Sequence, residues 1–169
     1  MNSYNLGNWT IDIDVEATRK FYQRFYAISD GCGCSYCINY VKACESYSKD
    51  IKDFFSDLGI IPTKEAEVYS CGEIENGRIL YSGFYHIVGR IINGEDCWNP
   101  VDSNTKVHNL FQLSDDFNFG FTYDTNLVPD GFPKPVIQME FESISLKFFY
   151  SPVVNSFYTI FPFISIDNY

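Results

Sequence analysis

Hydrophobic and polar residues alternate along the first part of the chain and then change to a helical repeat. Between Trp9 and Glu16 every second residue is apolar, which predicts a half-buried β-strand. Apolar residues then recur at spacings of three and four from Ala17 to Ile28. This repeat predicts a short helix over about residues 16–27, ended by Gly31, because glycine tolerates the backbone of a helix exit.

The strongest helical pattern lies between Cys37 and Leu58. Apolar residues recur there at spacings of three and four, while lysines and acidic residues fall mostly between them. Gly59 stands where a C-terminal stop is expected, and Pro62 follows it. The pattern predicts one long amphipathic helix over residues 36–58.

After this helix the pattern is typical of strands. The runs 65–75 and 78–92 flank Asn76-Gly77, the pair favoured at a two-residue type I′ hairpin turn. The polar stretch 95–105 is the longest expected loop. Pro162 makes 157–166 an edge strand or an irregular arm. Further strand-like runs lie between the loop and that segment: 106–113, 117–123 and 136–150.

The order of these elements defines the expected fold class. Helices come early and strands follow together, which is typical of an α+β protein with a mostly antiparallel sheet. We expect the long helix and the shorter N-terminal helix to pack on that sheet. A length of 169 residues fits a single domain over residues 1–169.

Composition narrows the class of protein further. An apolar fraction of 46% with 20% charged residues excludes an intrinsically disordered chain. No apolar run approaches the roughly 18 residues of a membrane helix. Residues 1–10 have neither the basic nor the apolar region of a secretory signal, which predicts a cytoplasmic location.

The charge balance bears on possible partners. The formal net charge of -10 disfavours binding to nucleic acid or to anionic lipid, which both require a surplus of basic residues. An acidic chain suits a basic protein partner, although acidity also serves solubility alone. The expected acidic surfaces are Asp12, Asp14 and Glu16, the pair Glu95-Asp96, and the pair Asp115-Asp116.

Cysteines form the least generic segment of the chain. Cys32, Cys34 and Cys37 lie between the two predicted helices, and thiolates at this spacing suit a tetrahedral zinc site that lacks one ligand. Two other interpretations stay open. The three residues are small apolar residues that pack a tight turn, or Cys34 and Cys37 form a redox pair at a helix start. Cys44 lies in the apolar stripe of the long helix, where a core position is expected.

Several further segments accompany the cysteines: the strand at Trp9–Val15, Thr18–Tyr22, Cys32–Tyr40, Phe54 with Leu58–Ile60, and Tyr81–Gly89. Together these segments resemble an uncharacterised bacterial protein family. They share its Cys-x-Cys-x-x-Cys-x-Asn-aromatic motif and its later Gly-aromatic-Tyr-His segment. The resemblance covers roughly residues 9–92 and is loose over 136–146. It implies no function, but it pairs the cysteines with a strand histidine, which makes His86 the expected fourth zinc ligand. Ile38 stands where the family has an arginine, which weakens any inference of a basic site.

The hairpin predicts neighbours for His86. A regular two-residue turn places Glu67 directly across from His86, where a carboxylate orients a histidine or forms an ordinary surface pair. Gly83 and Gly89 fall on the opposite strand face, where a close approach to the backbone is expected.

Two functional hypotheses follow. The preferred one is a non-catalytic cytosolic interaction protein, such as an immunity or antagonist protein that neutralises a basic partner. The alternative is a zinc- or thiol-dependent enzyme centred on Cys34, Cys37 and His86, with Glu67 as the orienting carboxylate. The sequence contains no nucleophile elbow, P-loop or dinucleotide fingerprint.

Overall fold

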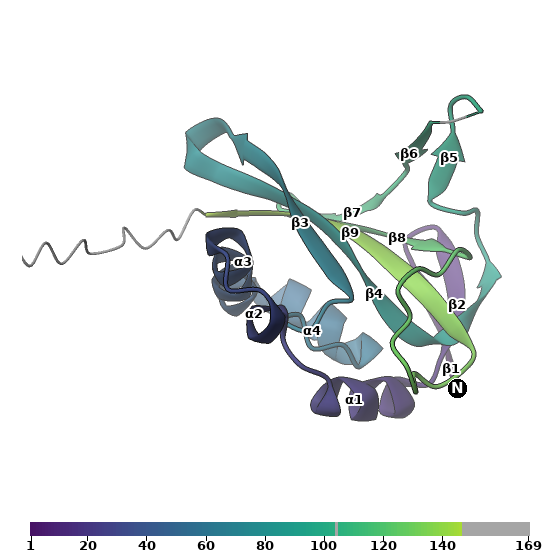
Figure 1. The fold of residues 1–169 in the computed structure, drawn as a ribbon. Coiled ribbons are helices and arrows are strands. Elements are labelled where there is room, and N and C mark those ends of the chain that lie inside the picture. Colours follow the sequence, from purple (N-terminus) through teal and green to yellow (C-terminus); the bar gives the residue numbers. More distant parts are fainter. Residues whose placement is uncertain (104, 147–169) are drawn as a thin grey trace, which may run out of the picture.

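The computed structural model describes residues 1–103 and 105–146, so the segment 157–166 and the end of the run 136–150 lie outside the described residues. Figure 1 shows the elements. The helices are α1 (Val15–Arg24), α2 (Ile28–Gly31), α3 (Ser35–Ser46) and α4 (Lys49–Leu58). The strands are β1 (Asn2–Leu6), β2 (Trp9–Ile13), β3 (Glu67–Ile74), β4 (Arg78–Asn93), β5 (Trp98–Pro100), β6 (Lys106–His108), β7 (Phe111–Ser114), β8 (Phe117–Thr122) and β9 (Val136–Leu146).

The strands confirm the α+β class with an antiparallel sheet. The seven-stranded sheet has the order β1-β2-β4-β9-β8-β7, and β3 pairs with β4 beside this path. Every strand pair is antiparallel among the described residues. Strands β5 and β6 form a separate two-stranded unit, the arm, which rises from the other side of the sheet from the helices (Figure 1). None of the described helices is long and apolar enough to cross a membrane.

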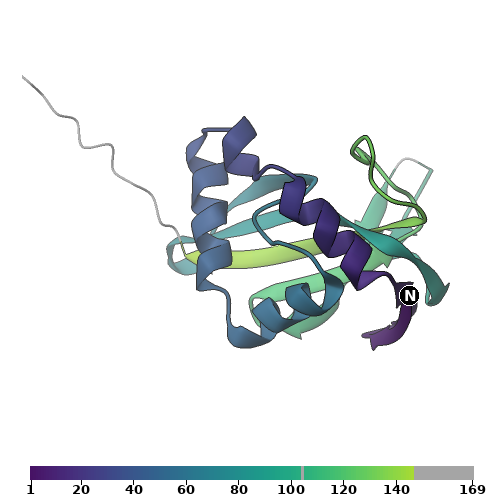
Figure 2. The same ribbon diagram turned by 90° about the horizontal axis from the view of Figure 1, so that it is seen from below.

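All the helices lie against one face of the sheet, which we call the helix face (Figure 2). Apolar side chains alternate along the strands, so one set points to this face. Aromatic rings dominate the core beneath the helices. Phe55 of α4 contacts Tyr85 and Phe117 with ring centroids 5.2 and 5.3 Å apart, and Phe141 lies 5.1 Å from Tyr85.

The predicted long helix is two helices, which corrects the sequence-based expectation. Tyr47 and Ser48 have extended backbones with ψ of 144° and 162° between α3 and α4. The Ser48 side chain accepts a hydrogen bond from the Ile51 backbone N–H at 3.4 Å and so caps α4. Tyr47 and Ile51 are both buried, so the apolar spacing continues through the break and conceals it.

Strand β4 has two partners along one edge, and helix α1 fills the gap between them. Strand β3 pairs with β4 as far as Phe84, and β2 begins its pairing at Gly89. The Tyr22 hydroxyl of α1 donates to the His86 carbonyl at 2.9 Å and accepts from the His86 N–H at 3.0 Å. The Thr18 hydroxyl accepts from the next outward-facing N–H, that of Val88, at 3.0 Å. These hydroxyls replace a missing strand.

Tyr22→Phe is expected to lower the free energy of unfolding by about 1–3 kcal/mol, because it leaves a buried N–H and a buried carbonyl without partners. Urea denaturation measures the change. Tyr26→Phe is the control, because Tyr26 is 60% exposed. Equal effects of the two substitutions would contradict the role given to Tyr22.

The register of the β3–β4 hairpin differs from the prediction by two residues. Glu67 lies opposite Phe84 and not opposite His86. The turn has three residues, Glu75–Gly77, which shifts the pairing by one. A bulge at Cys71 shifts it once more.

Candidate metal centre

The thiol group consists of Cys32, Cys34 and Cys37, which surround the start of α3. Their sulfur atoms all lie within 4.8 Å of one another, so the group could hold a metal ion. Sulfurs around a tetrahedral zinc are about 3.8 Å apart, given Zn–S bonds of about 2.3 Å. Small side-chain rotations therefore suffice to form the site. This convergence fits the metal and redox interpretations better than simple packing of a turn.

The local backbone explains why the sulfurs converge. The Cys34 side chain caps α3, its Sγ accepting a hydrogen bond from the Cys37 N–H at 3.4 Å. This backbone hydrogen bond lowers the pKa of the exposed Cys34 thiol. Burial raises the pKa of the Cys37 thiol to about 12. The group thus joins one thiol with a lowered pKa to one with a raised pKa.

The asparagine of the cysteine motif anchors the start of α3 to the sheet. Asn39 is buried, and its side-chain amide donates to the Tyr81 hydroxyl at 3.0 Å. The same hydroxyl donates to the Tyr36 carbonyl at 3.0 Å. These bonds fix the first turn of α3 relative to β4 and hold the thiol group in place.

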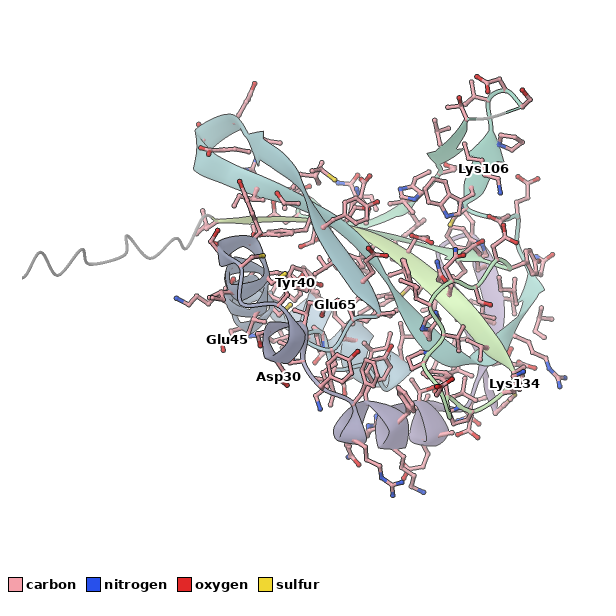
Figure 3. The ribbon with its side chains drawn as sticks, viewed as in Figure 1. Asp30, Tyr40, Glu45, Glu65, Lys106 and Lys134 are labelled. Carbon is pink, nitrogen blue, oxygen red and sulfur yellow. The ribbon has the colours of Figure 1, made fainter. Side chains whose placement is uncertain are left out.

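Tyr40, the aromatic residue of the cysteine motif, connects this motif to the Gly-aromatic-Tyr-His segment. The Tyr40 and Tyr85 hydroxyls are 2.6 Å apart, and the Tyr85 hydroxyl donates to the Pro62 carbonyl at 2.7 Å. Tyr40 lies between α3 and the sheet (Figure 3). The cysteine segment and the Gly-aromatic-Tyr-His segment thus pack on each other through their tyrosines.

The other cysteines lie apart from the thiol group. Cys44 is buried in the core, as the sequence pattern predicted, and Cys97 is buried in the same core. Cys71 is exposed at the β3 bulge. No disulfide is present among the described cysteines.

His86, the expected fourth ligand, is not brought to the thiol group. Among the described residues that group contains cysteines only. Tyr85 points to the helix face, so its neighbour His86 points to the opposite one. There the His86 Nε2 lies 2.8 Å from the Asn126 carbonyl, and the ring contacts Phe132. Burial lowers the pKa of His86. Glu67 does not pair with His86 either, so the enzyme hypothesis lacks its expected constellation.

The face opposite the helices, the arm face, contains a polar group that sequence reasoning missed. Glu140 is 4% exposed, and its Oε1 accepts hydrogen bonds from Gln138 Nε2 at 2.6 Å and Trp98 Nε1 at 3.2 Å. The ring of His108 lies against Trp98, with centroids 3.6 Å apart. Alternating polar residues at 138, 140 and 142 predict a wet strand face, but Gln138 and Glu140 are buried.

Some carboxylates of the predicted acidic surfaces form contacts within the protein. Strand β2 ends at Ile13, so Asp14 caps α1 and Glu16 forms an ion pair inside that helix. Asp96 accepts hydrogen bonds from the arm and from β8, and Asp116 pairs with Arg78. Asp14 and Glu16 therefore do not lie on one strand with Asp12, as the alternation from Trp9 to Glu16 predicted.

Comparison with models of protein families, with curated proteins and with solved structures finds no match to this chain. Function is therefore inferred from the geometry of the sites.

Proposed function

We propose that this protein binds one thiophilic metal ion, zinc, through the thiolates of Cys32, Cys34 and Cys37. The observation that carries the proposal is the convergence of the three sulfurs within 4.8 Å at the start of α3. Three sulfur ligands favour zinc or another soft ion over magnesium or calcium, which prefer oxygen.

The electrostatics of the helix start support thiolate formation. The first N–H groups of α3 point toward the thiol group, and the positive end of the helix dipole favours negative charge there. A bound cation displaces the remaining protons, including that of the buried Cys37. The result is three thiolates around one ion.

The fourth ligand of this ion is solvent or an added molecule. No histidine, carboxylate or further cysteine joins the thiol group among the described residues. Cys34 is exposed, so water reaches the ion from that side. Zinc with three protein ligands and an open position is typical of sites that exchange ligands, whereas structural sites are closed.

Zinc affinity is expected to fall more than about 100-fold in Cys34→Ser, because losing even a group that only hydrogen-bonds to a zinc ligand costs about 10- to 100-fold. Competition with a chromophoric chelator, on reduced protein without a histidine tag, measures the affinity. Cys71→Ser is the matched control, since Cys71 is also exposed but lies outside the thiol group. His86→Gln is expected to bind zinc as the wild type does.

Two outcomes would refute the metal proposal. One is equal zinc affinity in the Cys34→Ser and Cys71→Ser proteins. The other is absence of zinc binding combined with ready formation of a Cys34–Cys37 disulfide, which would favour the redox interpretation. A loss of zinc in His86→Gln would restore His86 as the fourth ligand and refute the open position.

Interaction with a basic protein remains a second proposal. It is supported by the net charge of -10 and by the carboxylates Asp102, Asp124 and Glu140 around one cavity on the arm face. Co-purification followed by identification of a basic partner tests it, and binding that is insensitive to salt would count against it.

A further inference from the structure

A cavity of about 560 Å³ lies between the arm and the sheet, on the arm face. We call it the arm pocket. Its size is within the range of small-molecule sites. Strand β3 and the arm rise on either side of this region (Figure 1). The cavity is bounded by Tyr69 of β3, Phe84 of β4, Trp98 and Lys106 of the arm, and Gln138 and Glu140 of β9.

Glu140 is a buried carboxylate in this pocket, and its hydrogen-bond partners carry no positive charge. Its side chain is 5% exposed, and its partners Gln138 and Trp98 are neutral donors that both reach Oε1. Burying a carboxylate is costly unless an opposite charge compensates it. The side chain nevertheless lines an open cavity.

The neighbouring cations do not balance this carboxylate. His108 lies with Nε2 at 3.8 Å from Glu140 Oε2 and with Nδ1 at 3.8 Å from Glu142 Oε1, so even a protonated His108 is shared by two carboxylates. Lys106 is the one lysine or arginine among the described lining residues, and it pairs with Asp124 at 3.4 Å.

Aromatic side chains complete the surroundings. Tyr69, Phe84 and Trp98 line the same cavity. Aromatic faces attract ammonium and guanidinium groups, and tryptophan does so most strongly. A buried carboxylate beside aromatic rings matches a ligand with a positive head and an apolar stem.

We propose that the arm pocket binds an organic cation of side-chain size, an alkylammonium or alkylguanidinium group, with Glu140 as its counter-ion. This site is independent of the thiol group, and the proposal does not rest on zinc binding. The cation comes either from a free amine or from a lysine or arginine of a peptide, and both present the same chemistry.

Titration of the full chain by calorimetry tests the proposal. The probes are n-butylamine and n-butylguanidine as hydrochlorides, with n-butanol and butyrate as neutral and anionic controls. We expect saturable binding of the two cations only. The tripeptides Gly-Lys-Gly and Gly-Arg-Gly, compared with Gly-Gln-Gly, show whether a peptide presents the cation better than a free amine does.

Glu140→Gln should weaken cation binding at least tenfold, because glutamine keeps an oxygen for Gln138 and Trp98 but removes the charge. Glu45→Gln is the control, because it removes an exposed carboxylate on α3, on the far side of the sheet (Figure 3). Thermal melting verifies that both variants fold. Should Glu140→Gln not fold, the wild-type comparison of cations with butanol still decides. The proposal is overturned if butanol binds as well as the cations, if no probe binds, or if a folded Glu140→Gln binds cations normally.

Discussion

Raising the pH from about 5 to 8 is expected to destabilise this protein through one carboxyl group, that of Glu65. Glu65 is 2% exposed, and among the described residues neither carboxyl oxygen has a hydrogen-bond partner. It lies between α2 and the sheet, near Tyr40 (Figure 3). Burial raises the pKa of Glu65 from 4.5 to about 8. Burial raises the pKa of the nearby Cys44 thiol, and the charge of Glu65 raises it further.

The direction of the effect follows from proton linkage. Below pH 4.5 the carboxyl is protonated in both folded and unfolded chains, so its contribution to stability is fully present. Between 4.5 and 8 the unfolded chain releases the proton while the folded chain retains it, so stability falls as the pH rises. The loss amounts to about 1.4 kcal/mol for each unit of the pKa difference at most. Above 8 no further loss arises from this group.

Urea denaturation at a series of pH values, compared between the wild type and Glu65→Gln, measures this contribution. The variant should be more stable than the wild type at pH 8, and its advantage should shrink toward pH 5. His86, whose pKa burial lowers, contributes in the opposite direction but is present in both proteins. Glu67→Gln, at an exposed position two residues away, should follow the wild type. Parallel curves for the wild type and Glu65→Gln would show that Glu65 has an ordinary pKa when folded.

Gly83→Ala is expected to lower the free energy of unfolding by about 3 kcal/mol or more, the upper range for overpacking. A Cβ atom at Gly83 would lie 2.2 Å from the Glu67 carbonyl oxygen and 3.0 Å from the Phe141 ring. The first of these contacts is with backbone, which cannot rotate away. The close approach that the sequence predicted at this glycine is therefore made by the neighbouring strand.

Gly33→Ala provides the comparison inside the cysteine motif. A Cβ atom there would meet nothing within 4 Å, so we expect a change within about 1 kcal/mol, toward greater stability. The zinc affinity of this variant should equal that of the wild type. Similar losses of stability in Gly83→Ala and Gly33→Ala would mean that the β3–β4 contact is not as close as described.

Patterns of local sequence predicted the elements well and their junctions poorly. Period-two alternation identified β2, and three- and four-residue spacing identified α1 and the surface shared by α3 and α4. The pattern did not predict the helix break at Tyr47–Ser48, because the apolar spacing is the same on both sides of it. The hairpin register was predicted wrongly, because the third turn residue and the bulge each add one residue to the hairpin. The alternation of apolar and polar residues does not reveal such insertions.

The candidate site formed by neighbouring residues was predictable from the sequence, and the contacts that depend on long-range packing were not. Cys32, Cys34 and Cys37 are close in sequence, so their spacing alone indicated that they meet. The placement of His86 depends on which sheet face it points to and on long-range packing, which one sequence does not specify. Burial of Glu140 depends on Trp98 of the arm, about 40 residues away in a segment that the sequence suggested was a loop.

X-ray absorption at the zinc edge, on the full chain loaded with one equivalent of zinc under reducing conditions, tests the metal proposal most directly. We predict three sulfur neighbours at about 2.3 Å and one lighter oxygen neighbour, with the sulfur signal reduced in Cys34→Ser. Zinc surrounded by oxygen and nitrogen alone, or by four sulfurs, would contradict a three-thiolate site with an open fourth position.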